Sequence, residues 1–386
     1  MSFTNMTVLS HGRTICDEFL FPGNEYEARI GKVSEIIDKE GLDGLLIYTN
    51  SLSRGNVCYL TGFSNFLSWS VSMVILPKGG KPILVATIAP RDIAFTSKLL
   101  PEFVEIVAAG LSLVSNEHIS VKTIEYMKEN GLLSGKKWGS VNFDCLPYMA
   151  DAPWKEVFPG GIPDCSKAYY ALRSRKSDSE MYVISQASAM AKRAAYEYMR
   201  QAQPGVSETI LASKIDRELR INGANTVSIL TGADKSGGAS LHVPRERCFE
   251  DGDTVCIFAD IGLQGYHGSF GATKIIGSMS TQQESLFAKA HQLWDGKLAD
   301  MLETKESIVG WHNAVCGEYE YYTIVNGIGC DLVEYPDQYG SEAKLESGMT
   351  ITLSMNVQKE GAGAVFMSEN FLVAENSFIP MSGPGK

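Results

Sequence analysis

The chain lacks the sequence signals of several special classes of protein. Its eight cysteines include no CxxC pair, and scattered cysteines in a chain of 386 residues are typical of reduced core residues rather than a disulfide framework. No apolar run is long enough to cross a bilayer, and the N-terminal segment lacks the apolar centre of a secretory signal. We therefore expect a cytoplasmic protein.

Positive charge is also scarce. The chain has 34 lysines and arginines against 45 aspartates and glutamates, which gives a formal net charge of -11. Nucleic acids and anionic membranes are polyanions and would be repelled by such a surface. We expect neither as a partner, and a small molecule as the ligand.

The first part of the sequence predicts an α/β domain over residues 1–168. A helix is expected from Glu25 to Glu40, because its apolar residues recur on one helical face, and Gly41 is a typical residue at the end of a helix. The apolar run from Gly44 to Thr49 predicts a buried strand. Three shorter strands are expected at Val57–Leu60, Ser72–Leu76 and Pro82–Thr87.

A second domain is predicted over residues 169–386. Ser177 followed by Glu180 is a capping box, so a helix should begin there and end before Pro204. A second helix is expected from Ser207 to Ile221, and a third from Gln282 to about Leu302. The predicted strands are Thr226–Thr231, Thr254–Ala259, Thr350–Met355 and Ala364–Val373. Helices followed by strands indicate an α+β domain.

The segment from Gly252 to Gly277, GDTVCIFADIGLQGYHGSFGATKIIG, resembles the central signature of the creatinase, prolidase and aminopeptidase P family. Further landmarks follow in the family's order, namely ASLHVP, VNGIGCDLVEYP, LESGMTITLSM and FMSENFLV. The resemblance implies a creatinase-like N-terminal α/β domain and a C-terminal domain of the pita-bread fold. It also implies a homodimer in which the N-terminal domain completes the partner's active site.

The resemblance carries five positions that hold two metal ions in metal-dependent members of the family. Here they are occupied by Asp260, Ser269, Asn326, Ser354 and Glu369. Two carboxylates with serines and an asparagine do not supply the charge that a pair of divalent cations requires. We expect no metal and no other cofactor, with one weakly held cation left open, and so a metal-free branch resembling creatinase.

Creatinase implies which groups act in such a pocket. His242 matches its proton-transferring histidine, although a loop histidine that only bonds backbone is the alternative. His267 is either a second acid/base group or a partner of the Asp260 carboxylate, and Asp260 and Glu369 are expected to orient a histidine or hold a cationic substrate.

The remaining candidates are expected to contact the substrate. Phe66 and Trp69 stand where creatinase has an arginine-bearing loop, so the ligand should present an apolar, aromatic or cationic group rather than a carboxylate; ordinary packing of these two aromatics is the alternative. The other expected contacts are Tyr266, Ser269, Asn326, Ser354 and Asn356.

Together these residues predict a metal-independent hydrolase that cleaves a C–N bond of the amide, amidine or guanidine type in a small nitrogen compound. His242 would carry the proton. A lyase acting on a small cationic substrate and a non-catalytic pita-bread protein that binds peptides are the alternatives.

Overall fold

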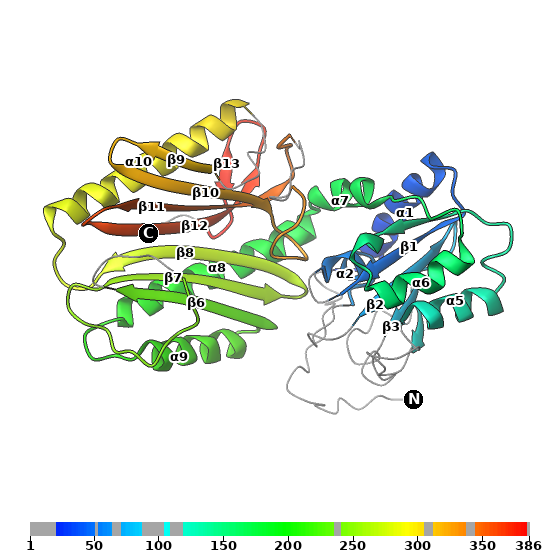
Figure 1. Cartoon of the computed structure of the whole chain (residues 1–386), viewed down its shortest axis with the longest axis horizontal. Coiled ribbons are helices and arrows are strands. Elements are labelled where there is room, and N and C mark those ends of the chain that lie inside the picture. Colours follow the sequence, from blue (N-terminus) through cyan, green and yellow to red (C-terminus); the bar gives the residue numbers. More distant parts are fainter. Residues whose placement is uncertain are drawn as a thin grey trace. The chain divides into compact units, whose positions relative to one another are not determined.

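A computed structural model describes residues 21–50, 53–63, 71–86, 104–108, 119–234, 241–304, 312–336 and 344–383. The chain divides into two compact units, Met1–Arg173 and Ser174–Lys386 (Figure 1). In the described residues, no helix is both long and apolar enough to cross a membrane.

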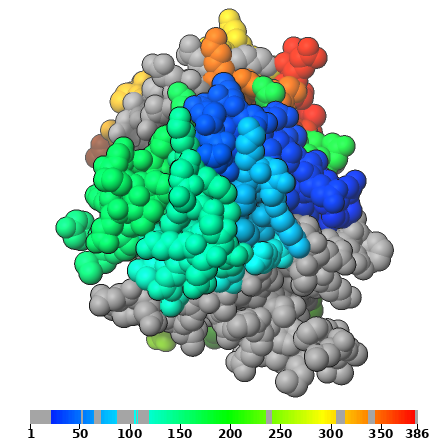
Figure 2. Space-filling model, turned by 90° about the vertical axis from the view of Figure 1, so that its right-hand side faces the viewer, coloured from blue at the N-terminus to red at the C-terminus, as the bar shows by residue number. Residues whose placement is uncertain are grey.

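The N-terminal unit is built on a five-stranded sheet with the strand order β4-β3-β2-β1-β5. β1 pairs with β2 in antiparallel and with β5 in parallel orientation, so the sheet is mixed. Figure 2 shows residues of this unit that are far apart in the sequence, dark blue and blue-green, side by side on one surface. Its elements are α1 (Gly23–Lys39), β1 (Gly44–Thr49), α2 (Gly55–Thr61), β2 (Ser72–Pro77), β3 (Ile83–Ala86), β4 (Glu105–Ala108), α5 (Ile119–Glu129), β5 (Trp138–Val141), the short helix η1 (Phe143–Cys145), α6 (Tyr148–Val157) and α7 (Ser166–Ser174).

Most of the predicted elements of this unit are present. The helix that ends before Gly41 is α1, and Gly41 has the positive φ of 63° that favours glycine after a helix. All six residues of β1 are buried, as the apolar run predicted. The strand predicted at Val57–Leu60 is wrong, because these residues lie in helix α2, which ends at the left-handed Gly62. A four-residue apolar run does not distinguish a buried strand from one turn of a buried helix.

The C-terminal unit contains an eight-stranded sheet with the order β6-β7-β8-β12-β11-β10-β9, and β13 pairs with β12. The predicted capping box is present, since Ser177 and Glu180 each bond the other's backbone N–H group at the start of α8. The elements are α8 (Asp178–Gln201), α9 (Glu208–Ile221), β6 (Thr226–Asp234), β7 (Thr254–Leu263), β8 (Tyr266–Ile275), α10 (Thr281–Thr304), β9 (His312–Cys316), β10 (Tyr319–Gly327), β11 (Thr350–Lys359), β12 (Gly363–Val373) and β13 (Phe378–Pro380).

The sheet of this unit consists of two halves that meet at a narrow seam. β8 and β12 pair only through Ser368 and Gly271, whereas the neighbouring strands pair along most of their lengths. Helices α8 and α9 pack on β6–β8, and α10 packs on the other half (Figure 1). The two halves therefore diverge away from the bridge and leave room for side chains between them.

Alternation along the strands separates two faces of this sheet. Ile257, Ala259 and Ile261 of β7 belong to the core with α8 and α9, so Asp260 points to the opposite side. Ile351 and Leu353 of β11 likewise belong to the core with α10, with polar residues between and beyond them. We call the side away from the helices the inner face; it carries Asp260, Ser269, Thr352, Ser354 and Asn356.

Candidate active site

An imidazole and a carboxylate form the ionisable centre of the inner face. Nδ1 of His267 lies 3.0 and 3.1 Å from the two carboxylate oxygens of Asp260, across the hairpin that joins β7 to β8. The His267 and Asp260 side chains are 19% and 9% exposed. The backbone N–H of His267 also donates to the carbonyl oxygen of Gly329, at 2.7 Å, which fixes the start of β8.

Uncharged polar groups continue from this pair across the seam. Ser269 pairs directly with Asp260, and its backbone N–H and hydroxyl both bond the side chain of Asn370, at 2.6 and 3.1 Å. Asn370 also donates to the Thr352 hydroxyl at 2.8 Å and accepts from Ser188 of α8 at 2.9 Å. The fully buried Asn370 thus joins the two half-sheets where they diverge.

Asn370 is a residue that the sequence alone did not single out. Asn370 directly follows Glu369 in the FMSENFLV motif. Because side chains alternate along a strand, this position alone could have indicated that Asn370 and Glu369 point to opposite faces of the sheet.

Two further predicted residues lie along the same face. The hydroxyl of Ser354 is 2.8 Å from that of Ser368 on the neighbouring strand. Asn356 is only 5% exposed, and its Oδ1 has no hydrogen-bond partner among the described residues. A buried acceptor without a hydrogen bond is costly and rare, so it calls for a partner that the described residues do not supply.

Asn326 and Tyr266 are held by the protein itself. Asn326 pairs with Thr352 and donates from Nδ2 to the carbonyl oxygens of Gly327 and Leu332, at 2.8 and 3.1 Å. The Tyr266 hydroxyl donates to Glu180 at 3.0 Å, and Tyr266 is 2% exposed. Their contact with a substrate therefore stays a prediction. Phe66 and Trp69 lie outside the described residues.

Glu369 does not join the Asp260 centre through its own contacts. It pairs with the core residue Leu353, so alternation directs it to the side that faces the helices. Its carboxylate accepts from the Ser382 hydroxyl at 2.8 Å and from the backbone N–H of Asn370 at 3.1 Å. Burial raises the pKa of Glu369 above its ordinary value, while the Ser382 hydroxyl and the charge of Lys192 oppose that rise.

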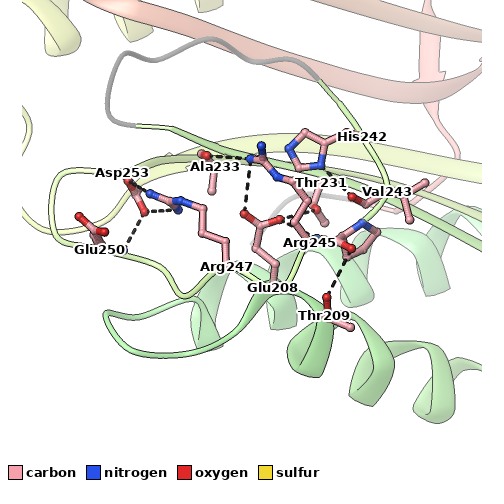
Figure 3. A network of polar contacts seen from close by, with 11 residues as sticks. Glu208, Thr209, Thr231, Ala233, His242, Val243, Arg245, Arg247, Glu250 and Asp253 are labelled. Carbon is pink, nitrogen blue, oxygen red and sulfur yellow. Dashed lines mark hydrogen bonds and ion pairs between the residues drawn. The ribbon is translucent and has the colours of Figure 1, made fainter.

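His242 lies beside the edge of β6 that faces away from β7, in a segment that Figure 3 shows in detail. Its backbone exchanges two hydrogen bonds of 2.8 Å with Thr231. Its Nδ1 lies 2.9 Å from the carbonyl oxygen of Val243, so Nδ1 carries the proton and Nε2 is left as the acceptor.

The chain is related to peptidases over nearly its whole length. The model of metallopeptidase family M24 matches residues 183–375, half of the chain. The chain belongs to family M24. The Xaa-Pro dipeptidase of Pyrococcus horikoshii is 23% identical over 366 residues, which cover 90% of this chain and 95% of that protein.

Solved structures show the same fold. A prolidase from Pyrococcus horikoshii superposes with a TM-score of 0.69 at 18% identity, covering 93% of this chain and 99% of that one. An X-Pro aminopeptidase from Thermotoga maritima gives a TM-score of 0.70 at 15% identity, covering 92% and 98%. The predicted architecture, an N-terminal α/β domain before a C-terminal pita-bread domain, is confirmed.

The expected function is contradicted by these relatives. They are named for Xaa-Pro peptides, and the matching family is one of metallopeptidases, so a metal-independent hydrolase of a small nitrogen compound is the wrong class. The lyase and the non-catalytic alternative are set aside with it. The family model places the chain in family M24, and the relatives give no support for a creatinase branch within it.

The metal ions implied by the family do not fit the residues present here. Only Asp260 and Glu369 are carboxylates among the five matched positions; Asp260 is bonded to His267, and Glu369 is directed to the other face. Within the described ranges, no group of three or more histidines, cysteines, aspartates or glutamates is arranged to hold a metal. The uncharged oxygens of the serines do not offset the charge of two divalent cations.

Proposed function

We propose that this chain hydrolyses short peptides at the centre formed by His267 and Asp260. Membership of family M24 supports a peptide substrate, and the names of the relatives make dipeptides of the Xaa-Pro type the first class to test. The observation that carries the proposal is the His267–Asp260 pair, which lies on the motif that resembles the family's central signature.

The geometry of this pair suits a general base. The Asp260 carboxylate accepts a hydrogen bond from Nδ1–H, which leaves Nε2 of His267 as the basic nitrogen. Nε2 takes a proton from a water molecule as its oxygen attacks the peptide carbonyl carbon, and Asp260 stabilises the imidazolium that forms. The proton then passes by way of Nε2 of His242 to the leaving amine as the C–N bond breaks, so both histidines are regenerated.

The neutral groups of the inner face supply hydrogen bonds to the peptide. Asn356 offers a buried acceptor for a substrate N–H group, and Ser354 and Ser368 offer hydroxyls. His242 is the second proton carrier in this proposal, because Val243 fixes its tautomer and its ring is partly exposed. General acid/base groups of this kind contribute roughly 10²–10⁴-fold each to a rate.

The test is hydrolysis of a panel of Xaa-Pro dipeptides by the purified protein, with release of proline followed by chromatography. We expect turnover by the natural protein and a loss of about 100-fold or more in kcat for His267→Ala. His291→Ala, at an exposed position of α10, is the matched control and should keep full activity. Unchanged kcat in His267→Ala, or no hydrolysis of any peptide by the natural protein, would refute the proposal.

A further inference from the structure

Residues 242–247, which we call the strap, run from β6 to the N-terminus of α9 (Figure 3). At one end His242 pairs with Thr231 of β6. In the middle, the first N–H groups of α9 bond the strap, because Thr209 N donates to the Arg245 carbonyl at 3.3 Å and Glu208 N to the Arg247 carbonyl at 2.9 Å. The strap therefore uses N–H groups that a helix leaves unsatisfied at its first turn.

Glu208 lies in the first turn of α9 and is fully buried, with 0% of the residue exposed. Its Oε2 accepts from the backbone N–H of Arg245 at 3.2 Å and from the Thr231 hydroxyl at 3.4 Å. Its Oε1 has no hydrogen-bond partner among the described residues, and the nearest cation is Nη2 of Arg245 at 3.9 Å. In Figure 3 the carboxylate reaches from the helix toward both the strand and the strap.

Burial of this carboxylate is expensive, and stability of the helix does not require it. A charged group without full compensation loses its hydration, whereas a glutamate exposed at the first turn of α9 would interact with the helix dipole equally well. The negative charge is felt nearby, since the pKa of Tyr198 is raised first by burial and further by Glu208. The buried position is explained by the two groups that Glu208 joins, β6 and the strap.

The far end of the strap is fixed separately. Arg247 donates two hydrogen bonds, of 2.7 and 2.9 Å, to the fully buried Asp253. Between His242 and Arg247 the strap includes Val243, which is 73% exposed and gains little from packing.

Besides the N–H groups of α9, side chains hold the middle of the strap: Thr209 donates from its hydroxyl to the Pro244 carbonyl at 3.4 Å, and Arg245 donates from Nη2 to the Ala233 carbonyl at 3.3 Å. Glu208 is the fully buried side chain among them and the one that bonds the strap and β6 together, so it contributes to offsetting the conformational freedom that the strap loses.

We infer that Glu208 is a positioning residue, which orders the strap so that His242 is held in place for proton transfer. The inference rests on the proposed function, in which His242 carries a proton. Glu208 itself does not touch the reacting atoms; it acts through the Arg245 amide and the backbone pairing of His242 with Thr231.

A double-mutant cycle tests the inference. Glu208→Ala should lower kcat by about 10- to 100-fold, with KM changed less, because a hydrogen bond to a charged group is lost at the strap and not at the substrate. In the His242→Ala background the same substitution should cause no further loss of kcat. Equal losses in both backgrounds would show a general structural effect and overturn the inference. Glu208→Gln keeps one acceptor oxygen and should recover part of the activity, and Glu218→Ala, exposed on the same helix, should behave as the natural protein.

Amide hydrogen exchange tests the strap without any activity. The Arg245 N–H should exchange at least about tenfold faster in Glu208→Ala, while the amides inside α9 keep their protection. Unchanged exchange at Arg245 would overturn the inference even in an active enzyme. If the natural protein hydrolyses no peptide but Arg245 loses its protection, the proposed function fails and the role of Glu208 in ordering the strap stands.

Discussion

Asp260→Asn removes the charge from the His267 pair and leaves its shape. Both carboxylate oxygens of Asp260 lie close to Nδ1 of His267, at 3.0 and 3.1 Å, so either oxygen can accept the hydrogen bond from Nδ1–H. Asparagine offers one oxygen and one NH₂ group in the same place. Where the NH₂ group faces Nδ1, the ring must accept there, and its proton moves to Nε2, which then has no lone pair for water.

The size of the effect follows from these two consequences. Loss of a hydrogen bond to a charged partner costs about 1.5–3 kcal/mol, which corresponds to roughly 10- to 150-fold in rate when the bond acts in the transition state. The pair is mostly buried, with side chains 19% and 9% exposed, so screening by water is limited. Removal of the base by the wrong tautomer raises the upper limit to about 10⁴-fold.

The assay is steady-state hydrolysis of the best Xaa-Pro dipeptide across a range of pH, together with circular dichroism to verify the fold. We expect kcat to fall by about 10- to 10⁴-fold and KM to change little, because Asp260 holds the base and not the substrate. Folding should be nearly unaffected, since asparagine has the same shape. A folded Asp260→Asn protein with natural kcat would refute the base mechanism.

Three other predictions test separate parts of the C-terminal unit, and Lys78→Met in the N-terminal unit serves as a control for one of them. Restoring the family's ligand types on the inner face should create a site for one Mn²⁺ ion, and we expect the natural protein to bind none. Elemental analysis and a rise in melting temperature measure the binding. Two ions bound by the natural protein would contradict the argument that its donors do not fit the metals. The restored positions are Ser269→Asp, Asn326→His and Ser354→Glu. Lys176→Met removes the cation from the 2.6 Å ion pair with Glu334, whose side chains are 1% and 7% exposed, and should cost about 3–5 kcal/mol in urea unfolding. Lys78→Met, in a pair with 54% and 60% exposed side chains, should cost about 0–1 kcal/mol, and equal costs would contradict the argument from burial. Burial raises the pKa of Glu369, so the stability of the natural protein relative to Glu369→Gln is highest in acid and falls as the pH rises through that pKa. Melting temperatures of the two proteins, measured from about pH 4 to 8, should therefore diverge in favour of the glutamine variant. Parallel curves would show that the pKa of the carboxylate is not perturbed.

Much of the fold could be read from local patterns. The capping box of Ser177 and Glu180 and the glycine after α1 located helix ends because such signals act within one turn of the chain. The missed β8 begins with Tyr266 and His267, in a glycine-rich segment whose apolar alternation is weak. Its strand conformation depends on pairing with β7, and the local sequence pattern of β8 does not predict that pairing.

The sequence by itself determined the family resemblance and the chemical types at its five matched positions, because motif order and side-chain identity do not depend on coordinates. Only the tertiary structure decided which of these groups meet. The hairpin brought His267 to Asp260, while strand pairing with Leu353 directed Glu369 to the opposite face. The register between strands distant in the chain is set by the packing of the whole sheet on its helices, and a change of one residue in that register reverses the side to which every side chain points.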